Sequence, residues 1–198
     1  MFINLTCVLV YVAGVGCRPA KSMSDGVETA ECWDLALKND RRPSLIAFSR
    51  QDVPTLRDTH TTENLSAKGA YELAGDANAK VTFLATGTEV SLAMEARAKL
   101  AAEGISARVV SMPCWALFEE QPEDYRKKTL GPGTIKVAIE AAARQGWDRY
   151  IGSELLGDGG AFVGMASFGA SGPYKDVYAK FGITADAAVT AAKKLLKI

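Results

Sequence analysis

The stretch from residue 80 to residue 111 constrains the fold more than any other part of the sequence. It begins with KVTFLA, a β-branched and aromatic run typical of a buried strand. A segment with apolar residues on one helical face follows and ends at Gly104, which suits a left-handed helix stop. Residues 107–111 (ARVVS) predict the next strand. Strand, helix and strand in this order favour a parallel pair with a right-handed crossover, and therefore an α/β fold.

The start of this helix carries a local signal of its own. Thr86 and Glu89 have the spacing of a capping box. In that motif the hydroxyl accepts a hydrogen bond from a backbone N–H of the first turn, and the carboxylate reaches back to the cap residue. The spacing therefore predicts Thr86 as the N-cap of the helix.

The rest of the C-terminal part continues the α/β pattern. Residues 136–141 (KVAIEA) predict a third strand, and residues 150–152 a fourth, weaker one. Residues 157–172 are rich in glycine and predict a loop. Residues 184–198 place apolar side chains at helical spacing and predict an amphipathic helix docked on a core.

The N-terminal part predicts fewer regular elements. Residues 18–26 are polar with proline and glycine and predict a loop, whereas residues 27–38 consist of good helix formers. Residues 44–49 (SLIAFS) form a short apolar run typical of a buried strand. Residues 51–68 are mostly polar and predict a linker.

Charge and cysteine content exclude several classes of function. The chain of 198 residues has 23 basic and 23 acidic side chains, so no positive field favours nucleic acid or an anionic membrane. It contains a single histidine and four cysteines without a C-x-x-C pair, a poor basis for a closed zinc site. The scattered thiols fit a reducing compartment, although their even number is also compatible with a disulfide.

Residues 2–17 form an uncharged, mostly apolar stretch. It is shorter than the roughly 20 residues that a membrane-spanning helix needs. A secretory signal has this apolar length, but no lysine or arginine precedes the run, and its end is not a clean A-x-A cleavage pattern. The alternative interpretation is a mis-called gene start. Both stay open, and a cytoplasmic location is expected, with a plastid as the other option.

The glycine-rich segment matches no nucleotide-binding motif. Gly164 and Gly169 have the spacing of a P-loop, but Ala170 and Ser171 follow where the motif needs a lysine. A dinucleotide fingerprint fails because Phe162 stands where the third glycine belongs. We therefore expect these glycines to serve backbone conformation and close packing.

Two further candidates fail on the sequence alone. Gly157-Asp158-Gly159 resembles the start of the metal–diphosphate motif of thiamine enzymes, which needs a later asparagine as a second oxygen ligand for Mg²⁺. The last asparagine of the chain is Asn78, so that ligand is missing. His60 has the pKa range of a general base, but its polar surroundings favour a solvated side chain.

Arg50 is the one candidate binding residue. It follows the predicted strand 44–49 in the tripeptide Ser49-Arg50-Gln51. In open α/β sheets ligands bind beyond the carboxyl ends of the strands, where a guanidinium offers a two-pronged donor to phosphate. A single arginine in this position is more often a surface or salt-bridging residue, so the pattern leaves both interpretations open.

Several strings together resemble the C-terminal third of transketolases, in the order of that family. They are Arg18-Pro19, VETAECWDLAL (27–37), RPSLIAFSRQ (42–51), FLATGTEVSLAMEA (83–96), ARVVSMP (107–113) and GAFVGMASFGASGP (160–173). Residues 1–17 and 21–24 depart from the family pattern.

The resemblance implies a three-layer α/β sandwich with a mixed, mostly parallel sheet over residues 76–198. It implies that residues 25–55 are a helix and strand left from the pyrimidine-binding domain, that 56–75 are a linker, and that 1–24 lie outside the family. The family moves a two-carbon ketol unit between sugar phosphates, in the pentose phosphate or Calvin pathway, with thiamine diphosphate and Mg²⁺. Arg50 matches the family arginine that holds the substrate phosphate.

By the same resemblance, the residues that hold the cofactor belong to parts of the enzyme absent from this sequence. We therefore expect the chain alone to bind no cofactor and to be inactive, and to act as part of a homodimer. The alternative is a non-catalytic dimerisation or partner-binding module. A helix 27–37 and strand 44–49 without their sheet neighbours should also expose apolar surface and promote self-association.

Overall fold

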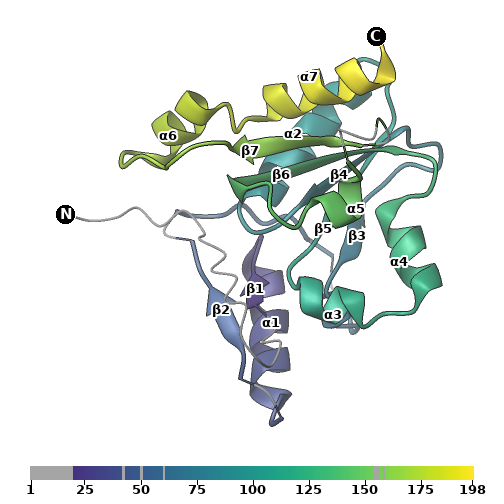
Figure 1. Ribbon diagram of the computed structural model, residues 1–198. Coiled ribbons are helices and arrows are strands. Elements are labelled where there is room, and N and C mark those ends of the chain that lie inside the picture. Colours follow the sequence, from purple (N-terminus) through teal and green to yellow (C-terminus); the bar gives the residue numbers. More distant parts are fainter. Residues whose placement is uncertain (1–19, 42, 50, 60, 154–156, 158) are drawn as a thin grey trace.

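A computed structural model describes residues 20–41, 43–49, 51–59, 61–153, 157 and 159–198. Its main sheet has five strands in the order β3-β5-β4-β6-β7 (Figure 1). Their bounds are Tyr71–Ala74 (β3), Val81–Ala85 (β4), Ala107–Ser111 (β5), Ile135–Ala143 (β6) and Ala161–Met165 (β7). β3 runs antiparallel to β5, and the other neighbours are parallel. The predicted mixed, mostly parallel sheet is confirmed.

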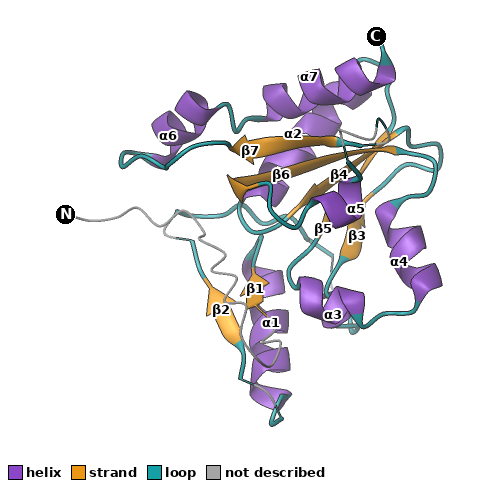
Figure 2. Ribbon diagram, viewed as in Figure 1, coloured by secondary structure: helices purple, strands orange, loops and turns teal. Residues whose placement is uncertain are grey.

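Helices cover both faces of the main sheet and complete the predicted three layers (Figure 2). One face carries α2 (Glu89–Ala102), α6 (Tyr174–Phe181) and α7 (Ala185–Leu196). The other carries α3 (Trp115–Glu119), α4 (Glu123–Leu130) and α5 (Asp148–Ile151). None of the helices in the described part of the chain combines the length and the apolar character needed to cross a bilayer.

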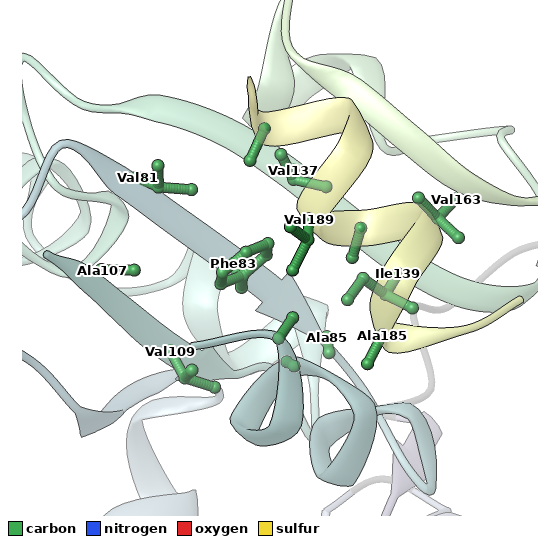
Figure 3. Packing of buried hydrophobic residues seen from close by; sticks show 14 of the residues in the cluster. Val81, Phe83, Ala85, Ala107, Val109, Val137, Ile139, Val163, Ala185 and Val189 are labelled. Atoms are coloured by element: carbon green, nitrogen blue, oxygen red, sulfur yellow. The ribbon is translucent and has the colours of Figure 1, made fainter. Parts of the chain in front are cut away.

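The alternation of side chains along β4 divides the core into two clusters. Phe83 is fully buried and packs toward α2 and α7, where Val189 lies beside it (Figure 3). Leu84 points to the opposite face and packs with Phe118 and Trp147. β4 is buried along its whole length, as its β-branched and aromatic composition predicts.

A small second unit precedes the main sheet. Its strands β1 (Ala20–Ser22) and β2 (Leu45–Ala47) pair in parallel, and α1 (Gly26–Lys38) connects them. An η1 3₁₀ turn (Leu65–Lys68) then leads to β3. The predicted helix 27–38 and strand 44–49 are thereby confirmed, and Figure 1 shows this unit beside the carboxyl-end loops of the main sheet.

The structure differs from the prediction at the last parallel strand. Residues 150–152, predicted as a strand, form the end of α5 and its C-cap. The strand β7 lies instead within residues 157–172, which were predicted as a loop. Glycine in a strand suggests a loop, but here it permits the close approach of two backbones.

The predicted capping box is also wrong. The N-cap of α2 is Thr88, not Thr86, and no side chain caps the first turn. The Glu89 carboxylate accepts hydrogen bonds from the hydroxyls of Thr88 and of Tyr178 on α6, so Thr86 is not its partner.

Two short strands occupy stretches that were predicted to lack them. β1 lies within the predicted loop 18–26, and β3 lies within the predicted linker 56–75. Both are short and pair with strands far away in the sequence, so no local pattern marks them. β3 is an edge strand antiparallel to β5, so it is not part of the alternation of parallel strands and helices that the sequence pattern predicts.

The small unit exposes apolar side chains, which confirms the expected apolar surface. They are Val27, Trp33, Leu37, Leu45 and Phe48. The rings of Trp33 and Phe48 lie next to each other, with centroids 6.3 Å apart. Parallel sheets are normally covered on both faces and contain more than two strands, so this unit is left with an uncovered apolar surface.

We predict that this surface causes self-association. Replacing both Trp33 and Phe48 with glutamine should lower the weight-average mass in sedimentation equilibrium at about 50 µM, because exposed apolar surface promotes association at µM to mM concentrations. Ile198→Gln removes an exposed apolar residue elsewhere and serves as the control. A monomeric wild-type chain at this concentration would contradict the prediction.

Candidate functional site

β2 leads directly to the predicted phosphate-binding tripeptide. The strand ends at Ala47, and the hydroxyl of Ser49 donates a hydrogen bond to the carbonyl of Gln51 at 3.0 Å. Arg50 lies outside the described residues, so its role stays a prediction. His60, predicted as solvated, also lies outside them. The described contacts therefore define the surroundings of the tripeptide rather than the arginine itself.

The N-terminus of α1 is built around the buried Asp25. Its Oδ1 accepts a hydrogen bond from the backbone N–H of Glu28 at 2.7 Å and caps the helix. Its Oδ2 accepts from the backbone N–H groups of Leu56 and Arg57 at 3.3 and 3.1 Å. One carboxylate thus joins the start of α1 to the segment that follows β2.

Glu31, further along α1, holds the same segment by an ion pair with Arg57. Arg57 donates to both of its oxygens, at 2.9 and 3.0 Å. The Arg57 and Glu31 side chains are only 7% and 13% exposed, which shields the pair from solvent. Burial opposes ionisation of Glu31, but hydrogen bonds from Arg57 and Ser66 outweigh it and hold the pKa of Glu31 below its ordinary value.

Glu28 connects α1 to the main sheet. Its Oε1 accepts from the hydroxyl of Tyr71 on β3 at 2.8 Å and from that of Ser111 on β5 at 2.6 Å. Its Oε2 accepts from the backbone N–H of Ser24 at 2.5 Å. Burial raises the pKa of Glu28, although these donors work against the rise.

The guanidinium of Arg57 also lies 5.0 Å from the centre of the Tyr71 ring, in cation–π geometry. A continuous set of buried polar contacts therefore links the small unit, the linker and the main sheet. We call it the junction network, and its members are Asp25, Glu28, Glu31, Arg57, Tyr71 and Ser111.

A second group of buried acids lies at the carboxyl end of the main sheet. Glu89 accepts hydrogen bonds from the hydroxyls of Thr88 and Tyr178. Glu140 on β6 accepts from the indole N–H of Trp147 at 2.5 Å. Burial raises the pKa of Glu140 to about 7; the Trp147 hydrogen bond acts in the opposite direction, and the nearby Glu89 adds to the rise. Such a group titrates near neutral pH.

The glycines of residues 157–172 have a packing function. A Cβ atom on Gly160 would lie 2.1 Å from the carbonyl oxygen of Lys136, and one on Gly164 would lie 2.4 Å from that of Glu140. The expected close backbone packing is confirmed at these two positions, where β7 lies against β6. Asp158 of the rejected thiamine-type motif lies outside the described residues.

Within the described residues, no three or more histidine, cysteine, aspartate or glutamate side chains are grouped to hold a metal ion. The side chains of Cys32 and Cys114 are buried. Neither the junction network nor the Glu89–Glu140 pair was predicted from the sequence. One signal was available, because Asp25 and Glu28 have the spacing of a capping box directly before an apolar helix face.

A comparison with protein families decides the relationship of the chain. The model described as the transketolase-like TK C-terminal domain matches residues 69–184. The chain belongs to the transketolase family. It corresponds to the C-terminal part of a transketolase, as its sequence strings predict.

Individual transketolases match over nearly the whole chain. The enzyme of Rhodobacter capsulatus is 51% identical over 185 residues, which are 90% of this chain and 26% of the relative. The solved transketolase of Leishmania mexicana has a TM-score of 0.79 at 36% identity and is matched over 90% of this chain and 25% of its own. The chain thus spans about a quarter of these transketolases.

A third similarity concerns a transketolase encoded by a split gene and solved as an inactive β4 tetramer. Its TM-score is 0.71, and the match covers 91% of this chain and 58% of that one. The identity of 23% shows a shared fold.

Proposed function

We propose that the chain is the C-terminal part of a transferase that moves a two-carbon ketol unit between sugar phosphates. The observation that carries the proposal is the match to transketolases over 90% of the chain, which includes the small unit as well as the main sheet. Fold alone would not support a reaction, but the strings around β2 include the Ser49-Arg50-Gln51 tripeptide.

In this proposal Arg50 holds the terminal phosphate of the sugar substrate. Its place after a strand that ends at the ligand-binding side of an α/β sheet supports the assignment. A guanidinium can donate two parallel hydrogen bonds to a phosphate and remains charged at every working pH.

We predict that Arg50→Gln weakens sugar-phosphate binding in the assembled enzyme. The KM for ribose 5-phosphate should rise roughly 10- to 100-fold, because a charge-assisted contact contributes about 1.5–3 kcal/mol. Steady-state kinetics of the chain combined with the first three quarters of the Rhodobacter capsulatus transketolase provide the measurement. Arg41→Gln, at an exposed position in the same unit, controls for the lost charge. An unchanged KM would remove Arg50 from the phosphate site.

The chain's own residues do not fit the thiamine diphosphate and Mg²⁺ that the family uses. The Gly157-Asp158-Gly159 sequence lacks the later asparagine that would provide a second oxygen ligand, because the last asparagine is Asn78. We therefore propose that the cofactor is held by other parts of the complete enzyme, where its thiazolium ring would stabilise the ketol carbanion.

The binding experiment is a calorimetric titration of the purified chain with thiamine diphosphate and Mg²⁺. A ketol-transfer assay with xylulose 5-phosphate and ribose 5-phosphate accompanies it. Absence of both heat and turnover would support a chain that acts only with the rest of its enzyme. Saturable binding or turnover by the chain alone would contradict the proposal.

The proposed partners follow from the same reasoning. We propose that residues 25–55 complete a pyrimidine-binding domain, that 56–75 connect it, and that 76–198 form the C-terminal domain of a homodimeric enzyme. The exposed apolar side chains around Trp33 and Phe48 support a covering partner layer. The split-gene transketolase supports assembly of such chains into oligomers. We propose the cytoplasm as the compartment, with a plastid as the alternative, because the scattered cysteines fit reducing conditions.

A non-catalytic module is the second candidate function, and the specific observation in its favour is the same exposed apolar surface. Such a module would bind a partner without needing Arg50. Arg50→Gln therefore separates the two, because it should impair an enzyme and leave a binding module unchanged.

A further inference from the structure

The segment after β2 is held at both of its ends. At the start, Ala47 pairs with Ser22 in the parallel β1–β2 ladder. At the end, the backbone N–H of Arg57 donates to Asp25 at 3.1 Å, and its guanidinium binds Glu31. Arg50 stands between these two anchors in the sequence. The second anchor ties the described residues on the C-terminal side of the tripeptide to α1.

We propose that Arg57 is a positioning residue for the sugar-phosphate site, acting through the segment that carries Arg50. The inference rests on the proposed function of Arg50 and adds a role for residues of the linker and of α1. Arg57 touches no substrate in this account. Its task is to fix the path of residues 48–57 relative to α1.

The geometry of the Arg57 contacts suits positioning. A two-pronged ion pair has one preferred orientation, and the low exposure of both side chains keeps water from competing. Tyr71 of β3 lies under the guanidinium, so the position of Arg57 also depends on the main sheet. The C-terminal domain thus gains a physical connection to the phosphate site. Displacement of a binding group by about 1 Å can cost on the order of 100-fold in rate.

The alternative is that Arg57 only stabilises the fold. When Arg57 is replaced, Glu31 keeps other donors: the backbone N–H and hydroxyl of Ser66 at 3.1 and 2.7 Å, and the N–H of Leu65 at 3.2 Å. The linker therefore stays attached to α1, and the Arg57 variants should fold. This makes a kinetic test possible.

The test compares Arg57→Gln, Arg57→Lys and Arg50→Gln in the chain assembled with the first three quarters of the Rhodobacter capsulatus transketolase. Lys68→Gln, which breaks the exposed pair of Lys68 with Glu63, is the matched control. We expect Arg57→Gln to raise the KM for ribose 5-phosphate about 10-fold, with kcat changed less than about 3-fold, because binding geometry and not chemistry is disturbed. In Arg57→Lys the KM should rise less than in Arg57→Gln, since lysine keeps the positive charge but cannot form the two parallel hydrogen bonds of a guanidinium.

Hydrogen exchange of the chain alone provides a second readout. Arg57→Gln should accelerate exchange in residues 45–57 and leave β4 and β6 unchanged. An unchanged KM for Arg57→Gln beside a raised KM for Arg50→Gln would overturn the positioning role and leave the phosphate site intact. An unchanged KM for Arg50→Gln would overturn both. Equal changes in the KM for ribose 5-phosphate in Arg57→Gln and Lys68→Gln would also overturn the positioning role. So would an unchanged rate of hydrogen exchange in residues 45–57.

Discussion

Replacing Glu28 with alanine is expected to destabilise the chain by about 3 kcal/mol. The variant leaves three buried donors, the hydroxyls of Tyr71 and Ser111 and the backbone N–H of Ser24, without their acceptor. Each unmet donor costs more than the net gain of an ordinary hydrogen bond, because its desolvation is no longer offset. Urea unfolding followed by circular dichroism measures the change.

A mutant cycle separates the lost acceptor from other effects of the substitution. Tyr71→Phe and Ser111→Ala each remove one donor and leave Glu28 with two, so each should cost about 1 kcal/mol. In the background that lacks both hydroxyls, Glu28→Ala should be less costly by at least about 1 kcal/mol, because fewer donors are left unmet. Strict additivity of the three changes would show that Glu28 does not act through these partners.

The second large effect concerns pH. Burial raises the pKa of Glu140 to about 7, so the native state keeps a proton that the unfolded chain releases at lower pH. Stability is therefore highest below the ordinary pKa of a glutamate and falls as the pH rises toward 7. A tenfold change in proton affinity corresponds to about 1.4 kcal/mol, so the full loss of stability is on the order of 3 kcal/mol. Burial also raises the pKa of Glu89, which acts in the same direction.

The variant Glu140→Gln tests this dependence. A glutamine imitates the protonated acid and can still accept the hydrogen bond from Trp147. We expect it to match the wild type near pH 5 and to exceed it in stability at pH 8. Glu95→Gln removes the same charge from an exposed part of α2 and serves as the control. A Glu140→Gln variant that is less stable than the wild type at pH 8 would refute the assignment.

The parts of the fold that were predicted correctly have strong local patterns. The run KVTFLA is β-branched and apolar throughout, and it forms the buried central strand β4. The Gly104 stop and the strand 107–111 were equally clear, because the short βαβ connection leaves few alternatives. β7 was missed because its glycine content imitates a loop, although glycine is what allows its backbone to lie against β6.

The candidate site could be predicted only in part. The prediction of Arg50 as the phosphate-binding residue rests on the family resemblance, since one arginine after one strand is weak as a motif. The contact between Glu28 and Ser111 joins residues 83 positions apart, and no local pattern can specify a partner so distant. A side chain such as Glu31 looks like an ordinary solvated helix residue in the sequence, yet folding buries it against Arg57.

Our central proposal is that this chain provides a working part of a transketolase and does not act alone. Its most direct test is to combine the chain with the first three quarters of the Rhodobacter capsulatus transketolase, the relative that is 51% identical over the shared part. Ketol transfer from xylulose 5-phosphate to ribose 5-phosphate is then measured for each polypeptide and for the mixture. We predict turnover in the mixture and none from either polypeptide separately. Turnover by the chain alone, or a correctly assembled mixture without turnover, would contradict the account.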